Sequence, residues 1–182
     1  MGNKNLKDID QFWTLFLDRD GVLNERPVND YVKSPEEFVF IPGVLESLKL
    51  LNEKFGLILI VTNQQGVGLG KMTIGDLNGI HQKMLEMISM SGGRIDKIYT
   101  CTDIKTSEQN CRKPNLSMAF TAKNDFPSID FSRSVMVGDT ESDITFGEKA
   151  GMITVQVGDE APVLRANFHF PCLLNFSEYI DY

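Results

Sequence analysis

LFLDRDGVLN, residues 15–24, places two carboxylates, Asp18 and Asp20, directly after an apolar run. We expect residues 13–17 to form a buried strand, because a short apolar run that ends at turn residues is typical of a strand inside a parallel sheet. Both aspartates then lie at the carboxyl end of that strand, where open α/β sheets bind their ligands. Gly21 allows the chain to turn away sharply. An isolated Asp-x-Asp-Gly is equally good as a simple turn, so its meaning depends on the rest of the chain.

Polar side chains follow two further apolar runs in the same way. Residues 57–61 (LILIV) form a second predicted strand, which is followed by Thr62 and Asn63. Residues 134–137 (SVMV) form another, and Asp139 comes two residues after it. Because the carboxyl ends of parallel strands meet at one edge of a sheet, we expect a hydroxyl, an amide and a third carboxylate to join the aspartate pair there.

Two adjacent cations, Arg112 and Lys113, lie in a loop before a predicted helix at residues 116–123. Acids, a hydroxyl and a cation at one sheet edge are suited to phosphoryl transfer. Asp143 lies one helical turn after Asp139. It has two interpretations, as an outer residue of a metal site or as an acid that stabilises the first turn of a helix, and the sequence leaves both open.

The rest of the chain alternates predicted helices with predicted strands. This alternation predicts an α/β fold with a Rossmann-like parallel sheet flanked by helices. A length of 182 residues, of which 42% are hydrophobic, fits residues 1–182 as a single domain with an ordinary core. Further helices are predicted at residues 44–55, at 73–92, up to Ala150 and at the C-terminus, and further strands at residues 97–101, at 153–157 and near Phe168.

Five motifs follow one another along the chain: FLDRDGVLN (16–24), YVKSPEEFVFIPGV (31–44), TNQQGVG (62–68), CRKPN (111–115) and VGDTESD (137–143). Together they resemble the haloacid dehalogenase (HAD) superfamily of phosphohydrolases. Within it, the chain looks like the branch that contains D-glycero-D-manno-heptose 1,7-bisphosphate phosphatase and histidinol-phosphate phosphatase. Each motif is weak alone, but five in this order, over about residues 12–158, are hard to reach by chance.

The resemblance implies a mechanism. Asp18 would be the nucleophile that takes the phosphoryl group as an aspartyl-phosphate. Asp20 would be the general acid that protonates the leaving oxygen, and then the base that activates water. A Mg²⁺ ion held by Asp18, Asp139 and the backbone carbonyl of Asp20 would offset the repulsion between the attacking carboxylate and an anionic phosphate.

The same resemblance implies which residues bind the substrate, a small phosphorylated molecule. Thr62 and Asn63 would hydrogen-bond the phosphoryl oxygens. Lys113 would neutralise charge on those oxygens and on Asp18, with Arg112 beside it as a second cation.

The spacing of the motifs leaves no room for a cap domain. Residues 21–56 hold only a loop and one predicted helix, and residues 63–112 hold one helix, one strand and a loop. We therefore predict a capless enzyme whose open site takes its specificity from loops. A heptose bisphosphate is the first predicted substrate, although Leu69 and Thr140 stand where the heptose phosphatases carry an arginine and a lysine. The alternatives are a histidinol-phosphate phosphatase and a non-catalytic phosphate-binding module with the same fold.

The three cysteines raise the question of a structural zinc site. Many relatives carry a zinc loop of the form Cys-x-His…Cys-x-Cys, whereas this chain has Cys101, Asp103, Gln109 and Cys111 in a shorter loop. Structural zinc sites normally have four good ligands, so we predict no structural zinc. With Cys172 the cysteines number three, so the sequence predicts no disulfide framework.

Charge and hydropathy exclude several classes of partner. A net charge of −7 argues against a nucleic-acid surface, which needs a basic patch. No apolar run reaches the length of a membrane span, and residues 1–11 are polar, unlike a signal peptide. We therefore predict a cytoplasmic enzyme with no membrane or nucleic-acid partner, and the sequence predicts no particular oligomeric state.

Overall fold

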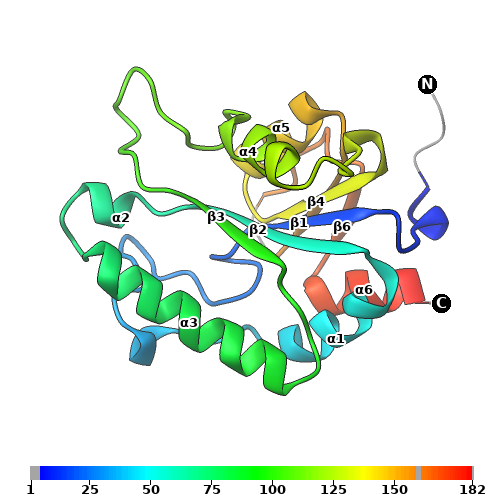
Figure 1. The fold of residues 1–182 in the computed structure, drawn as a ribbon, viewed down its shortest axis with the longest axis horizontal. Coiled ribbons are helices and arrows are strands. Elements are labelled where there is room, and N and C mark those ends of the chain that lie inside the picture. The colour runs from blue at the N-terminus through cyan, green and yellow to red at the C-terminus, as the bar shows by residue number, and fades with distance from the viewer. Residues whose placement is uncertain (1–4, 159–160, 182) are drawn as a thin grey trace.

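The computed structural model describes residues 5–158 and 161–181, and within these ranges it forms one sheet of six strands (Figure 1). The strand order is β3-β2-β1-β4-β5-β6, and all neighbouring strands are parallel. The predicted Rossmann-like parallel α/β fold is therefore confirmed. The strands are β1 (Thr14–Leu17), β2 (Leu57–Asn63), β3 (Lys97–Cys101), β4 (Ser134–Gly138), β5 (Ile153–Val157) and β6 (Phe168–Phe170).

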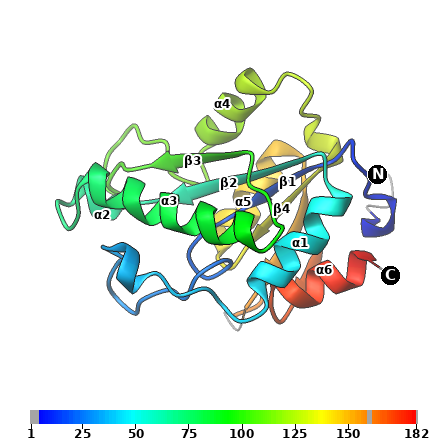
Figure 2. The ribbon, with the colours of Figure 1, turned by 60° about the horizontal axis from the view of Figure 1, so that its bottom comes forward.

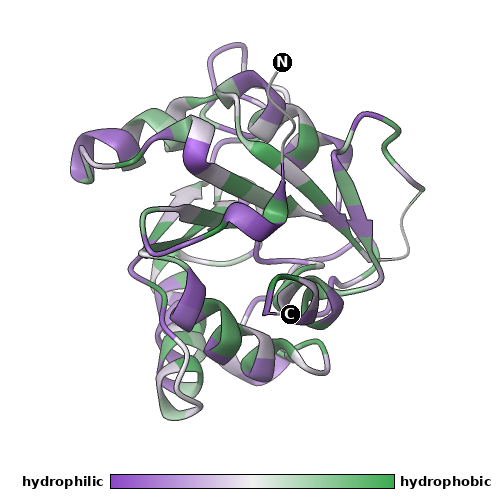
Figure 3. Cartoon of the chain, turned by 90° about the vertical axis from the view of Figure 1, so that its right-hand side faces the viewer, coloured by the Kyte–Doolittle hydropathy of each residue, from purple (hydrophilic) through white to green (hydrophobic). Residues whose placement is uncertain are grey.

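Helices cover both faces of the sheet (Figure 2). Helices α1 (Val44–Lys54), α3 (Ile74–Met90) and α6 (Leu173–Asp181) lie on one face, and α4 (Ser117–Asp125) and α5 (Glu141–Ala150) lie on the other. Successive residues of β1 alternate between the two cores, because Leu15 and Leu17 pack with α1, α3 and α6 while Phe16 packs with α4 and α5. Coverage on both sides explains why the inner strands β1, β2, β4 and β5 are buried along nearly their whole length, whereas the edge strands β3 and β6 are only partly buried. Figure 3 colours the chain by hydropathy, with hydrophobic residues in green.

Local sequence signals account for the helix ends. Thr73 and Asp76 form the capping box that opens α3, and Gly151, with a φ of 85°, ends α5 in the left-handed conformation. The short helix α2 (Gln65–Gly68) was not predicted, because four residues are too few to show helical periodicity. Short 3-10 helices at Leu6–Asp8, Pro35–Glu37 and Phe131–Arg133 were not predicted either.

The topology creates a crevice at the centre of the sheet. From β1 the chain moves outward to β2 and β3, and it then returns to β4 on the other side of β1. This reversal is the switch point at which open α/β sheets bind ligands beyond the carboxyl ends of their strands. In the described chain, residues 18–43 between β1 and α1 contain one 3-10 helix, and residues 64–112 contain α2, α3 and β3. Neither segment forms a cap domain, as predicted.

None of the helices in the described part of the chain is both long and apolar enough to cross a membrane.

Candidate active site

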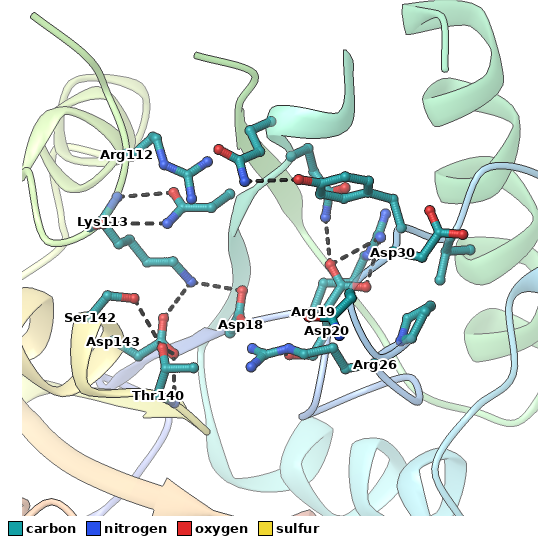
Figure 4. Close-up of a pocket in the computed structure, with 17 residues that line it drawn as sticks. Asp18, Arg19, Asp20, Arg26, Asp30, Arg112, Lys113, Thr140, Ser142 and Asp143 are labelled. Atoms are coloured by element: carbon teal, nitrogen blue, oxygen red, sulfur yellow. Dashed lines mark hydrogen bonds and ion pairs between the residues drawn. The ribbon is translucent and has the colours of Figure 1, made fainter. Parts of the chain in front are cut away.

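A cavity of about 450 Å³ lies over the carboxyl ends of the central strands (Figure 4). Five of the predicted site residues line it: Asp18, Asp20, Asn63, Arg112 and Lys113. The strand register explains part of this meeting, because Leu17 of β1 pairs with Ile60 of β2 and with Val137 of β4, so the three strands end close together.

Asp18 and Lys113 form a buried ion pair on the cavity floor. Nζ of Lys113 donates to Oδ1 of Asp18 at 2.7 Å and to the backbone oxygen of Val61 at 2.6 Å. It also lies 2.6 Å from Oδ1 of Asp143 (Figure 4). Burial raises the pKa of Asp18 to about 6, although the charge of Lys113 opposes this rise. Burial lowers the pKa of Lys113, but Asp143 and Asp18 outweigh burial and raise it, so this lysine stays charged.

Asp20 is held by three donors. Nη2 of Arg19 donates to both carboxylate oxygens, at 2.8 and 3.0 Å. Asn24 donates to Oδ1 at 2.9 Å, and Gln64 donates to Oδ2 at 2.6 Å. Burial opposes ionisation, but the positive charge and hydrogen bonds of Arg19, with those of Asn24 and Gln64, hold the pKa of Asp20 below its usual range. The carboxylate is therefore fixed in one orientation at the cavity wall.

Three buried carboxylates converge beside the cavity. Single oxygens of Asp18, Asp139 and Asp143 all lie within 4.8 Å of one another. Burial and the charge of Asp18 raise the pKa of Asp139 to about 8, although Arg26 opposes this. Such a cluster of hard oxygen donors, whose negative charges repel one another, fits a divalent cation such as Mg²⁺.

Gly21 is required for this convergence. A Cβ at Gly21 would lie 2.0 Å from Oδ2 of Asp139, and its φ of 88° is the left-handed conformation that favours glycine. Arg26 covers the same region, because its Nη2 donates to Oδ1 of Asp139 at 2.8 Å and to the backbone oxygen of Asp20 at 3.1 Å. The Asp139 carboxylate and the Asp20 backbone carbonyl therefore point toward the same place, which Nη2 of Arg26 occupies.

Asp143 combines the two interpretations that the sequence left open. Its Oδ2 accepts hydrogen bonds from the backbone nitrogen of Thr140 at 3.1 Å and from the Thr140 hydroxyl at 2.6 Å, which forms the capping box of α5. Its Oδ1 faces Lys113 and the acidic cluster. One carboxylate thus stabilises the helix start and adds negative charge to the site.

Thr62 and Asn63 are placed as supports of the site. Thr62 is fully buried, outside the residues that line the cavity, and its hydroxyl accepts from Gln64 at 2.8 Å. The Asn63 side chain makes two hydrogen bonds to the backbone of Lys113. Its Oδ1 accepts from the Lys113 backbone nitrogen at 2.9 Å, and its Nδ2 donates to the Lys113 backbone oxygen at 3.3 Å. Arg112 lines the cavity, and its Nη1 donates to the backbone oxygen of Asp103 at 3.3 Å.

Four contributing residues were not predicted: Arg19, Asn24, Arg26 and Gln64. Gln64 directly follows Asn63 within TNQQGVG, and Arg19 separates the two aspartates, so the motifs themselves were a signal for both. Arg26 lies in the loop between β1 and α1, where no periodic pattern points to a direction of the side chain.

The prediction of no disulfide is wrong, because Cys101 and Cys111 are bonded to each other with their Cα atoms 5.6 Å apart. Cys101 ends β3, and the loop that follows returns Cys111 to the same place, which an odd cysteine count does not reveal. Asp103 also ties the loop, because its Oδ2 accepts from the backbone nitrogen of Cys111 at 2.9 Å. Sulfur and carboxylate atoms of Cys101, Asp103 and Cys111 lie within 4.8 Å of one another, and the absence of zinc stays a prediction.

We expect reduction of this disulfide to lower the free energy of unfolding by about 2 to 3 kcal/mol, because the bond closes a loop of moderate length in the unfolded chain. Urea denaturation with and without a phosphine reductant measures the difference. The double variant Cys101→Ser, Cys111→Ser is the control and should be insensitive to the reductant. Equal midpoints for the oxidised and reduced native chain would contradict this expectation.

Comparisons with known proteins agree with this geometry. A family model described as HAD-hydrolase-like matches residues 110–162. A D-glycero-alpha-D-manno-heptose-1,7-bisphosphate 7-phosphatase of Mycobacterium tuberculosis is 33% identical over 170 residues, which cover 91% of this chain and 90% of the relative. A D-glycero-beta-D-manno-heptose-1,7-bisphosphate 7-phosphatase of Neisseria meningitidis is 30% identical over 176 residues, covering 91% of this chain and 93% of the relative.

A solved structure is similar as well. The D,D-heptose 1,7-bisphosphate phosphatase from B. bronchiseptica, crystallised with magnesium and phosphate, superposes with a TM-score of 0.83 at 27% identity. The match covers 92% of this chain and 97% of that one. The chain therefore belongs to the HAD superfamily, in the branch of the heptose bisphosphate phosphatases, and is a hydrolase of phosphoric monoesters.

Proposed function

We propose that this phosphatase is Mg²⁺-dependent and hydrolyses a heptose 1,7-bisphosphate through an aspartyl-phosphate on Asp18. The buried pair of Asp18 and Lys113 at the cavity floor carries the proposal, because their 2.7 Å contact sets a carboxylate and its neutralising cation where a phosphoryl group can enter. A carboxylate in this position can act as a nucleophile.

In the first half-reaction a carboxylate oxygen of Asp18 forms a bond to phosphorus, and the bond from phosphorus to the sugar oxygen breaks. Protonated Asp20 gives its proton to that departing oxygen. Lys113 neutralises charge on the transferring group and on Asp18. The donors that hold Asp20 keep its carboxyl group at the cavity wall, within reach of the leaving oxygen.

In the second half-reaction ionised Asp20 takes a proton from water, and the resulting hydroxide attacks phosphorus. The bond between phosphorus and Asp18 breaks, which frees inorganic phosphate and restores both carboxyl groups. The donors around Asp20 hold its pKa below the usual range, so its resting form is ionised, and the negative charge of an arriving phosphate is what would raise that pKa enough for Asp20 to carry the proton.

The acidic cluster supports a site for Mg²⁺. Asp18, Asp139 and the backbone carbonyl of Asp20 would hold the ion, with Asp143 adding charge beside them. When bound, the ion neutralises negative charge so that a carboxylate can approach a phosphate.

Two arginines favour a bisphosphate over histidinol phosphate. Arg26 and Arg112 line the same cavity as Lys113 and come from different loops, so a second phosphate would meet a cation of its own (Figure 4). Histidinol phosphate carries an ammonium group at its other end, which these guanidinium groups would repel. The names of the relatives support the same choice.

The test compares kcat/KM for heptose 1,7-bisphosphate, the heptose 7-phosphate and histidinol phosphate. We expect the bisphosphate to be preferred, and Arg112→Ala to raise KM for the bisphosphate about ten-fold while changing KM for a monophosphate little, because one charged contact is lost. A preference for histidinol phosphate would contradict the proposed substrate. Absence of phosphate release from every substrate would instead favour the non-catalytic alternative.

The stability of the metal-free protein should decrease as the pH rises. The folded-state pKa values of Asp18 and Asp139, about 6 and about 8, lie above the ordinary value of 3.8. A raised carboxyl pKa means that the folded state binds the proton more tightly than the unfolded state, so stability is lost as pH rises through these values. Without metal, the thermal midpoint should therefore decrease as the pH is raised from about 5 to about 8.

Added Mg²⁺ should oppose this loss, because it binds the ionised carboxylates. Thermal unfolding with and without Mg²⁺, followed across this range, should show a stabilisation that grows with pH. Stabilisation of equal size at every pH would show that these carboxylates are not the metal ligands.

A further inference from the structure

Arg19, between the two aspartates, has a buried guanidinium group with partners on two sides. Its side chain is 1% exposed. Nη2 donates to Asp20, and Nη1 lies 3.2 Å from Nε2 of His81. A buried guanidinium group needs acceptors in fixed places, because each unpaired N–H is costly away from water. Asp20 supplies one acceptor and His81 supplies another.

His81 accepts this hydrogen bond in its neutral form. A guanidinium group has only donors, so Nε2 of His81 must present its lone pair, which places the ring proton on Nδ1. Burial and the nearby charge of Arg19 lower the pKa of His81 to about 4, which keeps the ring neutral at physiological pH. His81 lies in α3, whose start is fixed by the capping box of Thr73 and Asp76.

We propose that His81 is a positioning residue for Asp20, which it holds through Arg19 in the orientation needed for proton transfer. The inference rests on the proposed role of Asp20 as general acid and base. His81 is absent from the residues that line the cavity, so it acts on catalysis without touching the substrate. The three residues form a chain from a rigid helix to the cavity wall.

The geometry explains why Arg19 needs this anchor. Asn24 and Gln64 also donate to Asp20, but among these three donors Arg19 is the charged one and bonds both carboxylate oxygens, so the orientation of Asp20 depends most on the orientation of Arg19. Bonds at both Nη atoms fix the guanidinium plane, and a fixed plane holds both Asp20 oxygens at 2.8 and 3.0 Å. Without the acceptor on α3, Nη1 is left buried without that partner and the guanidinium group is expected to rotate.

The test uses two substitutions at His81. His81→Leu keeps an apolar side chain of similar size but removes the acceptor, and we expect kcat to fall about ten-fold or more with KM nearly unchanged, as for other residues that orient a reacting group. His81→Gln retains an acceptor and should recover most of kcat. The matched control is His169→Leu, since His169 is exposed on β6 and lies outside the cavity lining, and it should leave kcat unchanged.

Two further measurements separate positioning from packing. Nitrogen NMR of the native protein should show His81 as the neutral tautomer protonated on Nδ1. Because His81→Leu leaves a buried N–H of Arg19 unpaired, its thermal midpoint should lie below that of His81→Gln, so kcat is compared well below both midpoints, where each variant is folded. Unchanged kcat in His81→Leu, or equal losses in both variants together with lowered midpoints, would overturn the inference while leaving the proposed function intact. A native enzyme that releases no phosphate would overturn both.

Discussion

Asp18→Asn is expected to abolish phosphate release while leaving the protein folded. The amide is nearly isosteric with the carboxylate, but it cannot serve as the nucleophile, so turnover should fall on the order of 10⁴-fold or more. The fold should not suffer, because the raised pKa of Asp18 shows that its ionised form is unfavourable where it lies. Lys113 also keeps its contact with Asp143. Steady-state phosphate release and thermal unfolding measure the two effects.

A matched control for this variant is Asp125→Asn. Asp125 pairs with Lys97 and Tyr99 on the surface, away from the cavity. This variant should retain native turnover, which would show that the loss of a carboxylate is harmful only at the site. If Asp18→Asn kept turnover within ten-fold of the native enzyme, Asp18 would not be the nucleophile.

Lys113→Met is expected to cost both turnover and stability. The Lys113 side chain is 1% exposed, and its ammonium group pairs with Asp18 and Asp143. Removing one partner of a buried ion pair leaves uncompensated charge, so the free energy of unfolding should fall by about 3 to 5 kcal/mol at neutral pH. Urea denaturation measures this loss. The loss should be smaller near pH 5, because protonated carboxyl groups no longer need a cation.

The control for this second variant is Lys97→Met. Lys97 pairs with Asp125 at 2.8 Å, but its side chain is 47% exposed. Exposed ion pairs contribute little, so this variant should lose less than about 1 kcal/mol. A loss of equal size at positions 97 and 113 would contradict the importance assigned to the buried pair.

The sequence predicts the strands well because each is a short apolar run with polar ends. The bounds of β3 and β5 are as predicted, and β2 extends two residues further, through Thr62 and Asn63. The carboxyl ends of parallel strands meet at one edge of a sheet, and this alone predicted that Asp18, Asn63 and Asp139 lie at the same edge.

Side-chain directions could not be predicted in the same way. Thr62 and Asn63 are neighbours on β2, and neighbouring strand residues point to opposite faces, so both could not face the phosphate alike. The contact between Arg19 and His81 joins residues 62 positions apart, and only the packing of α3 against the sheet brings them together. The Cys101–Cys111 bond depends on the path of an irregular loop, for which no periodic pattern exists.

Capture of the phosphoenzyme tests the central claim most directly. An Asp20→Asn variant should still be phosphorylated by a substrate whose leaving group needs no proton, such as acetyl phosphate, but it should lack the base for hydrolysis. Acid quenching, proteolysis and mass spectrometry should then find one phosphoryl group on the peptide that contains Asp18, at the Asp18 side chain. Phosphorylation at a different residue, or hydrolysis at the native rate with no phosphoryl group on Asp18 at any time, would contradict the account.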